Sequence, residues 1–306
     1  MKKFLFFAAL LAITSGAFAQ KDTSYWKTDG LIGLKFSQSG YKNWAAGGEN
    51  SLSGLASFKW HPVYTKGKLS WENLFLADLG FLMQGRDDAK KTDDRLELNT
   101  KLGYKASEFW YYSMLFNFKT QFLKGYNYEP DTPVYISNFM APAYIKLSLG
   151  MDYKPNKNFS LFLSLLTARW TIVKDQYLAD YGAFGLTPAE RDTAGNVISP
   201  ASRVRFEAGA FLRFAYSKEI MKNIVFMTKL ELFSNYLKNP QNIDVDWEVN
   251  INFKINEYFN ASINTHLIYD DDILIGVDEN NDGSIDYYGP RTQFKEVLGL
   301  GIVYVF

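Results

Sequence analysis

IDVDWEVNINFKIN, residues 243–256, alternates strictly between apolar and polar side chains. Val245, Trp247 and Val249 share one face of an extended chain, while acids and asparagines occupy the other. Period-two alternation is typical of a β-strand whose two faces meet different surroundings. This run has 14 residues, whereas soluble strands usually have about 5–6 and a membrane-spanning strand needs about 9–11. The pattern therefore indicates a strand that crosses a membrane.

The same alternation recurs in about twelve segments that are joined in turn by short and long connections. Outer-membrane barrels have this arrangement, with tight turns at the periplasmic rim and long loops outside. We predict an all-β fold, a transmembrane antiparallel β-barrel of about 12 strands with short periplasmic turns and long extracellular loops. The predicted strands are residues 30–38, 51–62, 68–82, 93–106, 109–123, 142–154, 158–172, 202–217, 222–236, 243–256, 259–270 and 292–306.

A soluble β-sandwich or lipocalin-like barrel is the alternative fold. Its strands would be shorter than these segments. A soluble barrel with so many strands would also enclose a wide interior, and the predicted loops offer nothing that would fill it. Both considerations favour the membrane barrel.

The N-terminus, MKKFLFFAALLAITSGAFAQ, has the three parts of a secretory signal peptide. Lys2 and Lys3 precede an apolar run, and Ala17-Phe18-Ala19 fits the small-x-small cleavage rule. The apolar run is too short to span about 30 Å of hydrocarbon. We expect residues 1–19 to be removed, residues 20–306 to form the barrel, and the protein to reach the outer membrane of a Gram-negative bacterium.

Composition excludes several classes of function. The chain has no cysteine, which excludes disulfides, thiolate metal sites and a cysteine nucleophile. Its formal net charge is zero, whereas a nucleic-acid-binding protein normally carries a basic face, so no nucleic acid is expected as a partner. Aromatic residues make up 17% of the chain, and they suit two belts in contact with outer-membrane lipids.

The C-terminus also resembles that of outer-membrane barrels. Leu298, Leu300, Ile302, Tyr304 and Phe306 share one parity, and the last residue is aromatic. Terminal strands of such barrels look like this. The resemblance implies recognition by the barrel-assembly machinery.

The face opposite the apolar one carries charges of both signs, and we expect it to line the barrel lumen. Buried unpaired charges are costly, so these side chains must be solvated or paired. Two interpretations stay open: a water-filled lumen that passes small polar solutes, or a lumen that paired charges close. The candidate lumen-lining residues are Arg95, Glu97, Lys101, Lys119, Arg203, Arg205, Glu207, Arg213, Lys229, Glu231, Asp244, Asp246 and Glu248.

Three functions are compatible with this reading of the chain. The first is a channel or transporter for small polar solutes, and the second is a non-conducting barrel that is structural or binds a partner. The third is a barrel-type lipid hydrolase, in which His266 would act beside Ser262 on the lumen face. No strained nucleophile motif is visible, so we do not expect an enzyme.

The segment Asp278–Asp286, DENNDGSID, resembles the start of an EF-hand-type calcium loop. Such loops place oxygen ligands at alternate positions and a glycine at the sharp turn. The usual glutamate at position 12 is absent, because Gly289 stands there. The alternative is a solvated acidic turn. If the loop binds Ca²⁺, the expected ligands are Asp278, Asn280, Asp282, Ser284 and Asp286.

Several strings spread over nearly the whole chain resemble one family. They are WAAGGENS at 44–51, FKTQF at 118–122, ISNF at 136–139, FSNYL at 233–237, HLIYDDD at 266–272 and QFKEV at 293–297. Together they look like an uncharacterised outer-membrane family of Bacteroidota, domain of unknown function 3078. The resemblance implies an outer-membrane barrel and brings no substrate or site residue. Leu165-Leu166-Thr167 stands where that family would have a strand break, which predicts a more regular seventh strand here.

Overall fold

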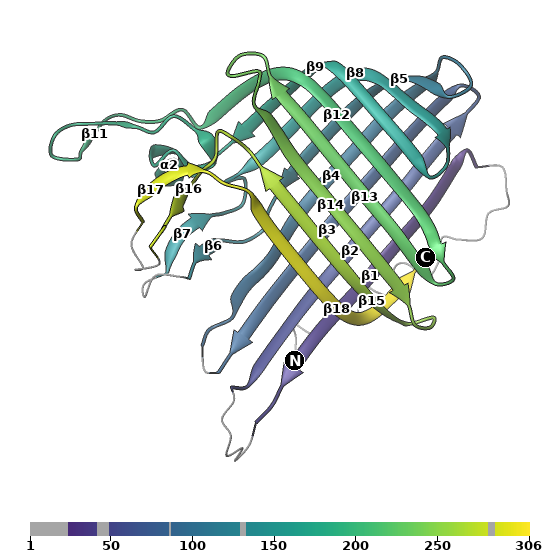
Figure 1. Ribbon diagram of the computed structural model, residues 1–306, viewed down its shortest axis with the longest axis horizontal. Helices are drawn as coiled ribbons and strands as arrows, with labels where there is room; N and C mark the ends of the chain where they lie inside the picture. Colours follow the sequence, from purple (N-terminus) through teal and green to yellow (C-terminus); the bar gives the residue numbers. More distant parts are fainter. Residues whose placement is uncertain (1–23, 42–48, 86, 129–132, 281–284) are drawn as a thin grey trace.

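The structure, a computed structural model, describes residues 24–41, 49–85, 87–128, 133–280 and 285–306. The predicted signal peptide, residues 1–19, lies outside these ranges. Twelve antiparallel strands close into one barrel (Figure 1). In barrel order they are β1 (Trp26–Ser39), β18 (Gln293–Val305), β15 (Phe259–Tyr269), β14 (Ile243–Lys254), β13 (Ile224–Asn235), β12 (Val204–Met221), β9 (Phe159–Ile172), β8 (Ala143–Asn156), β5 (Trp110–Thr120), β4 (Lys90–Lys105), β3 (Leu69–Gln84) and β2 (Ser51–Lys66).

The predicted fold, strand number and alternation of short and long connections are confirmed. Consecutive barrel strands pair with each other, and the first and last strands pair to close the ring. That closing seam is short: β1 and β18 pair over five residues, from Leu31 to Lys35, whereas β1 and β2 pair over fourteen. The backbone of Gly30 also exchanges two hydrogen bonds with Phe306, of 2.9 and 3.1 Å.

The seventh barrel strand, β9, contains a bulge, so the prediction that it would be more regular is wrong. Leu149 pairs with Leu166 and Met151 with Leu163, which leaves an extra residue in β9. Ser164 supports the bulge, because its hydroxyl donates to the Leu149 carbonyl at 2.8 Å and accepts from the Leu166 amide at 3.2 Å. Leu165 and Leu166 both face outward, 80% and 67% exposed. Before the bulge the even-numbered side chains of β9 face the lumen. After the bulge the odd-numbered side chains do.

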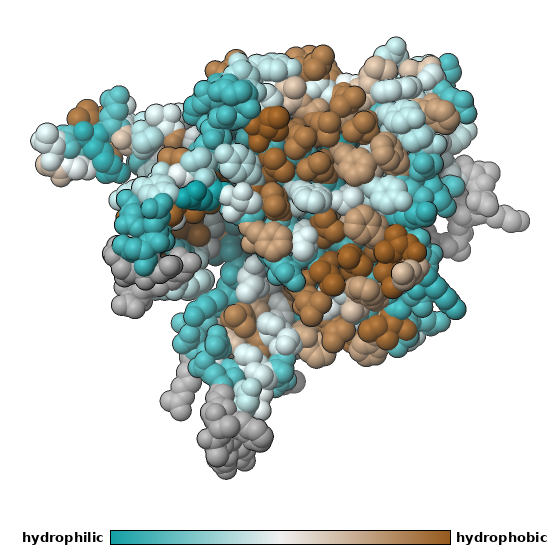
Figure 2. Space-filling view, in the orientation of Figure 1, coloured by the Kyte–Doolittle hydropathy of each residue, from teal (hydrophilic) through white to brown (hydrophobic). Residues whose placement is uncertain are grey.

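The outer wall of the barrel is apolar. Figure 2 shows apolar side chains over the strands of the visible wall and polar side chains towards the ends of the molecule. Leu298 and Leu300 on β18 are 76% and 64% exposed, which suits lipid rather than water as the neighbour. Aromatic side chains gather near the short-turn rim, where the Trp26, Tyr64 and Trp71 rings are in contact. Among the described residues, no helix is long and apolar enough to cross a membrane.

The long loops add small elements at one end of the barrel, which the sequence analysis did not foresee (Figure 1). An apolar cluster that includes Val173, Leu178 and Leu186 joins these loops, and Tyr135 packs against it. Tyr135 donates a hydrogen bond to Asp175 at 2.7 Å. The elements are β6 (Gly125–Asn127), β7 (Val134–Ser137), α2 (Gln176–Asp180), η2 (Ala183–Gly185), β10 (Glu190–Arg191), β11 (Val197–Ser199), β16 (Leu274–Val277) and β17 (Tyr287–Pro290).

Candidate functional site: the barrel lumen

Twelve of the thirteen predicted lumen residues lie on barrel strands, with side chains 2–31% exposed and engaged in ion pairs. Arg203 differs from them. It precedes the first residue of β12, is exposed, and forms no ion pair with the described residues. The twelve are Arg95, Glu97 and Lys101 on β4, Lys119 on β5, Arg205, Glu207 and Arg213 on β12, Lys229 and Glu231 on β13, and Asp244, Asp246 and Glu248 on β14.

Some of these ion pairs cross the lumen. β4 and β14 lie six strands apart in either direction around the ring, yet Arg95 Nη2 is 3.5 Å from Glu248 Oε1. Lys229 Nζ lies 2.8 Å from the same oxygen. Three strands apart, Lys146 on β8 meets Glu231 on β13 at 2.6 Å. The barrel is therefore crossed by charged side chains at mid-height.

A second group of charges lies towards the short-turn rim. Lys101 Nζ is 2.6 Å from Asp152 Oδ2, and Lys154 Nζ is 3.3 Å from the same oxygen. Lys154 also forms an ion pair with Glu72 on β3. The Asp152 side chain is only 1% exposed. Two lysines thus neutralise two acids on the inner wall.

The third group lies towards the long loops and centres on Arg169 of β9, which the sequence analysis missed. Arg169 holds Glu207 through two nitrogens, one at 2.7 Å, and Asp244 at 2.7 Å. The β9 bulge explains the omission, because strict alternation from Phe162 places Arg169 on the lipid face. The signal was present in the sequence: two adjacent leucines, Leu165 and Leu166, interrupt the alternation.

An apolar cluster also fills part of the lumen, and it was not predicted. Leu115, Phe162, Phe211 and Phe233 are 0–4% exposed and pack together from β5, β9, β12 and β13. The Lys146 ammonium lies 4.1 Å from the centre of the Phe211 ring. The Arg169 guanidinium lies 4.3 Å from the centre of the Phe233 ring. The Phe211 and Phe233 rings therefore pack against Lys146 and Arg169, and cation–π attraction adds to the packing energy.

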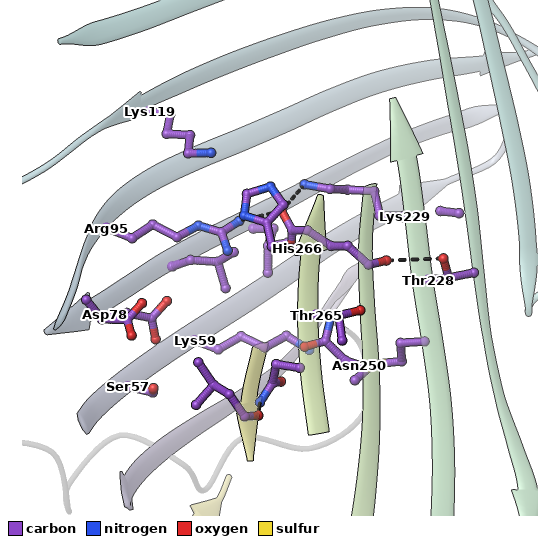
Figure 3. A pocket seen from close by; sticks show the side chains of 18 of the residues that line it. Ser57, Lys59, Asp78, Arg95, Lys119, Thr228, Lys229, Asn250, Thr265 and His266 are labelled. Carbon is purple, nitrogen blue, oxygen red and sulfur yellow. Dashed lines mark hydrogen bonds and ion pairs between the residues drawn. The ribbon is translucent and has the colours of Figure 1, made fainter. Parts of the chain in front are cut away.

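The other side of the lumen is open. A cavity of about 1230 Å³ is lined mainly by β2, β3 and β4, and residues of β1, β5, β8, β9, β12–β15 and β18 complete its wall (Figure 3). Its lining includes Lys157 and Asn158 in the β8–β9 turn, at the short-turn rim. It also includes Tyr126 and Ser137 in the loops of the opposite rim. The cavity therefore extends along the barrel beside the mid-height ion pairs.

His266 lies on the wall of this cavity, but it is not placed for hydrolysis with Ser262. The two side chains are four residues apart on one strand, which is about 13 Å at the usual rise. His266 Nε2 is 3.0 Å from Asp246 Oδ1, and Ser262 accepts from Lys35 Nζ at 2.6 Å. The serine and the histidine thus have other partners.

His266, Asp246 and Glu248 also bring ligand atoms within 4.8 Å of one another, a grouping that a metal ion can use. Cationic side chains already surround it. Lys229 and Arg95 contact Glu248, and Lys119 lies 4.0 Å from Asp246. A metal ion would have to displace these cations, so the geometry favours charge pairing over metal binding.

The predicted calcium loop is only partly described. Asp282 and Ser284 lie outside the described residues, and Asp278, Asn280 and Asp286 lie within them. Asp286 Oδ2 accepts the Glu279 backbone N–H at 2.8 Å. A hydrogen bond to Glu279 raises the pKa of the neighbouring Tyr287, and partial desolvation adds a smaller increase. These contacts join the two sides of the described part of the acidic turn.

Comparison with known proteins agrees with the family expected from the strings. Residues 36–126 match a family described as "Protein of unknown function (DUF3078)". The predicted resemblance to this family is confirmed over this segment, and the strings at 136–139, 233–237, 266–272 and 293–297 lie outside it. The matched segment runs from β1 to β6 and contains β2, β3 and β4, the strands that form much of the cavity wall.

Among solved structures, the chain is similar to an outer membrane channel from Pseudomonas putida F1 (TM-score 0.40, 14% identity, 95% of this chain and 98% of that chain covered). It is also similar to the translocator domain of the autotransporter NalP from Neisseria meningitidis (0.37, 9%, 98% and 95%). A third is the NanC porin (0.36, 9%, 91% and 98%). A search of curated proteins returned no match. At these identities the likeness concerns barrel architecture and not function.

Proposed function

We propose that this protein is an outer-membrane channel that lets small polar solutes pass along the open side of its lumen. The observation that carries the proposal is the cavity of about 1230 Å³ whose lining reaches both rims. Charged and hydroxyl side chains on its wall replace water around a polar solute. The mid-height ion pairs and the phenylalanine cluster narrow the route, which restricts it to small solutes.

Single-channel recording of the purified barrel in planar bilayers tests this proposal. We expect a small, steady conductance for each inserted barrel. Silence over repeated insertions, with the barrel shown to be folded by its resistance to denaturation in detergent, would contradict it.

A matched pair of variants locates the path. Ser57 on β2 lines the cavity (Figure 3), and its neighbour Ala56 faces the opposite way and is exposed on the outer wall. Ser57→Trp places a large ring in the path and is expected to lower the conductance. Ala56→Trp places the same ring in lipid and is expected to leave the conductance unchanged.

The second candidate, a non-conducting barrel, is favoured by a specific observation. Arg95 and Glu248 meet across the full ring, and Lys146 and Glu231 meet beside the apolar cluster. If these contacts close the whole lumen, both tryptophan variants behave like the unmodified protein. The two candidates are therefore separated by the same recordings.

A further inference from the structure

The cavity wall is unbalanced in charge, although the whole chain is neutral. Nine cationic side chains line the cavity against five carboxylates, an excess of four positive charges. The acids are Glu72, Asp78, Asp93, Asp94 and Glu248. The cations are Lys35, Lys59, Lys91, Arg95, Lys119, Lys154, Lys157, Lys229 and Lys295.

Most of the carboxylates are already neutralised by close partners. Asp94 lies 2.9 Å from Lys91, Asp93 pairs with Lys295, and Glu248 pairs with Lys229. Glu72 pairs with Lys154. Asp78 forms no ion pair within 4.0 Å among the described residues. One acid is thus left to attract cations from the solution.

The lysines are less fully neutralised. Among the described residues, no carboxylate oxygen lies within 4.0 Å of Lys35 Nζ or Lys157 Nζ. Lys119 has only Asp246, at 4.0 Å, and Lys59 has only the exposed Asp29, at 3.6 Å. Asp29 and Asp246 are not part of the cavity wall. Lys35 and Lys157 therefore keep their attraction for a mobile anion, and Lys59 and Lys119, which have one carboxylate each, keep part of it.

Lys35 is held in place by the strands around it. It extends from β1 across β18 to β15, where its ammonium donates to Ser262 at 2.6 Å. Two glycines of β18 make room for its stem: a Cβ added at Gly299 or Gly301 would lie 2.8 or 2.7 Å from Lys35 side-chain carbons. Asp78 and Asp93 are the acids whose charges act on it. The barrel thus positions an ammonium group at the cavity wall instead of leaving it in a mobile loop.

We infer that the channel selects small anions over small cations; this inference rests on the proposed function. A cleft lined by an excess of one sign concentrates the opposite sign inside it. Salt screens charges beyond about 8–10 Å at physiological strength, so the excess acts within the narrow path and hardly outside it. The substrate class is therefore small anionic solutes, for which chloride is the probe.

The test is the reversal potential of the full-length barrel in a KCl gradient. We expect it to lie towards the chloride equilibrium potential, with a chloride-to-potassium permeability ratio above one that falls as salt rises. Lys35→Glu, Lys59→Glu and Lys119→Glu combined change the lining to six cations and eight acids, and are expected to bring the ratio below one. Lys68→Glu, at an exposed turn position outside the cavity lining, is the matched control and should not change it.

The outcomes separate the two proposals. An absence of conductance overturns the channel itself. A steady conductance with a ratio at or below one in the unmodified protein overturns only the anion preference. If the triple variant does not fold, two other measurements decide the question. They are the chloride-to-potassium permeability ratio of the unmodified protein, expected above one, and its expected decrease in Lys35→Gln.

Discussion

Replacing Glu207 with glutamine is expected to destabilise the barrel more than any change of a surface charge. The Glu207 side chain is 2% exposed, and it accepts two hydrogen bonds from Arg169 and one from Asn235. Arg205 also lies 3.4 Å away. The glutamine keeps the shape of the side chain but removes its charge, so two buried guanidinium groups lose their closest shared counter-ion.

The expected loss of unfolding free energy follows from the burial of the Glu207 carboxylate. Breaking a buried ion pair from one side costs about 3–5 kcal/mol, and Arg169 keeps Asp244 at 2.7 Å, which limits the loss. We therefore expect the lower end of this range, about 3 kcal/mol, or a folding equilibrium shifted roughly a hundredfold. The measurement is urea unfolding in lipid vesicles, followed by tryptophan fluorescence.

Asp87→Asn is the matched control, because Asp87 pairs with Lys90 in an exposed loop and its side chain is 60% exposed. Exposed pairs contribute about 0–1 kcal/mol. A loss in Glu207→Gln no larger than that in Asp87→Asn would refute the view that lumen charges hold the wall together.

Three further predictions concern other parts of the molecule. Phe211→Ala in the lumen cluster should cost about 3–5 kcal/mol of unfolding free energy, whereas Phe206→Ala should cost less because lipid fills the space; equal losses in urea unfolding would contradict this. Burial, aided by the bond to Asp175, raises the pKa of Tyr135 to about 12, which favours the neutral phenol in the folded loop. That stabilisation is present below the ordinary tyrosine pKa of 10.0 and is lost as pH rises from there to about 12, so near-ultraviolet circular dichroism should show a step that Tyr135→Phe lacks. We also propose that the acidic loop binds Ca²⁺; calorimetric uptake should disappear in Asp282→Ala, and identical titrations would rule it out.

The barrel could be predicted from sequence because lipid and lumen impose the same alternation on most strands. Val245, Trp247 and Val249 must face lipid, and the acids between them must not. Lipid on one face and water or polar groups on the other fix the residue type at each position of a strand. This pattern lies within each strand, so it can be recognised without knowing which strands pair. The strand number and the alternation of turns and loops followed from it.

The pairing inside the lumen could not be predicted in the same way. Arg95 pairs with Glu97, two residues away on the same strand. Its second partner, Glu248, depends on strand tilt and side-chain reach across the ring, and neither is encoded near residue 95. Phe162, Phe211 and Phe233 escaped notice because an apolar residue at a lumen position contradicts the polar rule. Arg169 was missed because the β9 bulge changes by one residue which side chains face the lumen. The errors thus fall where the interior is filled, the region where contacts between distant strands decide the outcome.

The apolar cluster and its ion pairs fill only part of the lumen. They tie β5, β8, β9, β12 and β13 together, whereas β2 and β3 supply nine residues of the cavity wall and β1 closes the ring at a seam of five paired residues. Strands held by many buried contacts move less than strands held by few, and segments with few buried contacts open most readily. We therefore expect the width available to a solute to vary mainly with thermal motion of the wall near this seam, while the strands around the apolar cluster keep the barrel's shape.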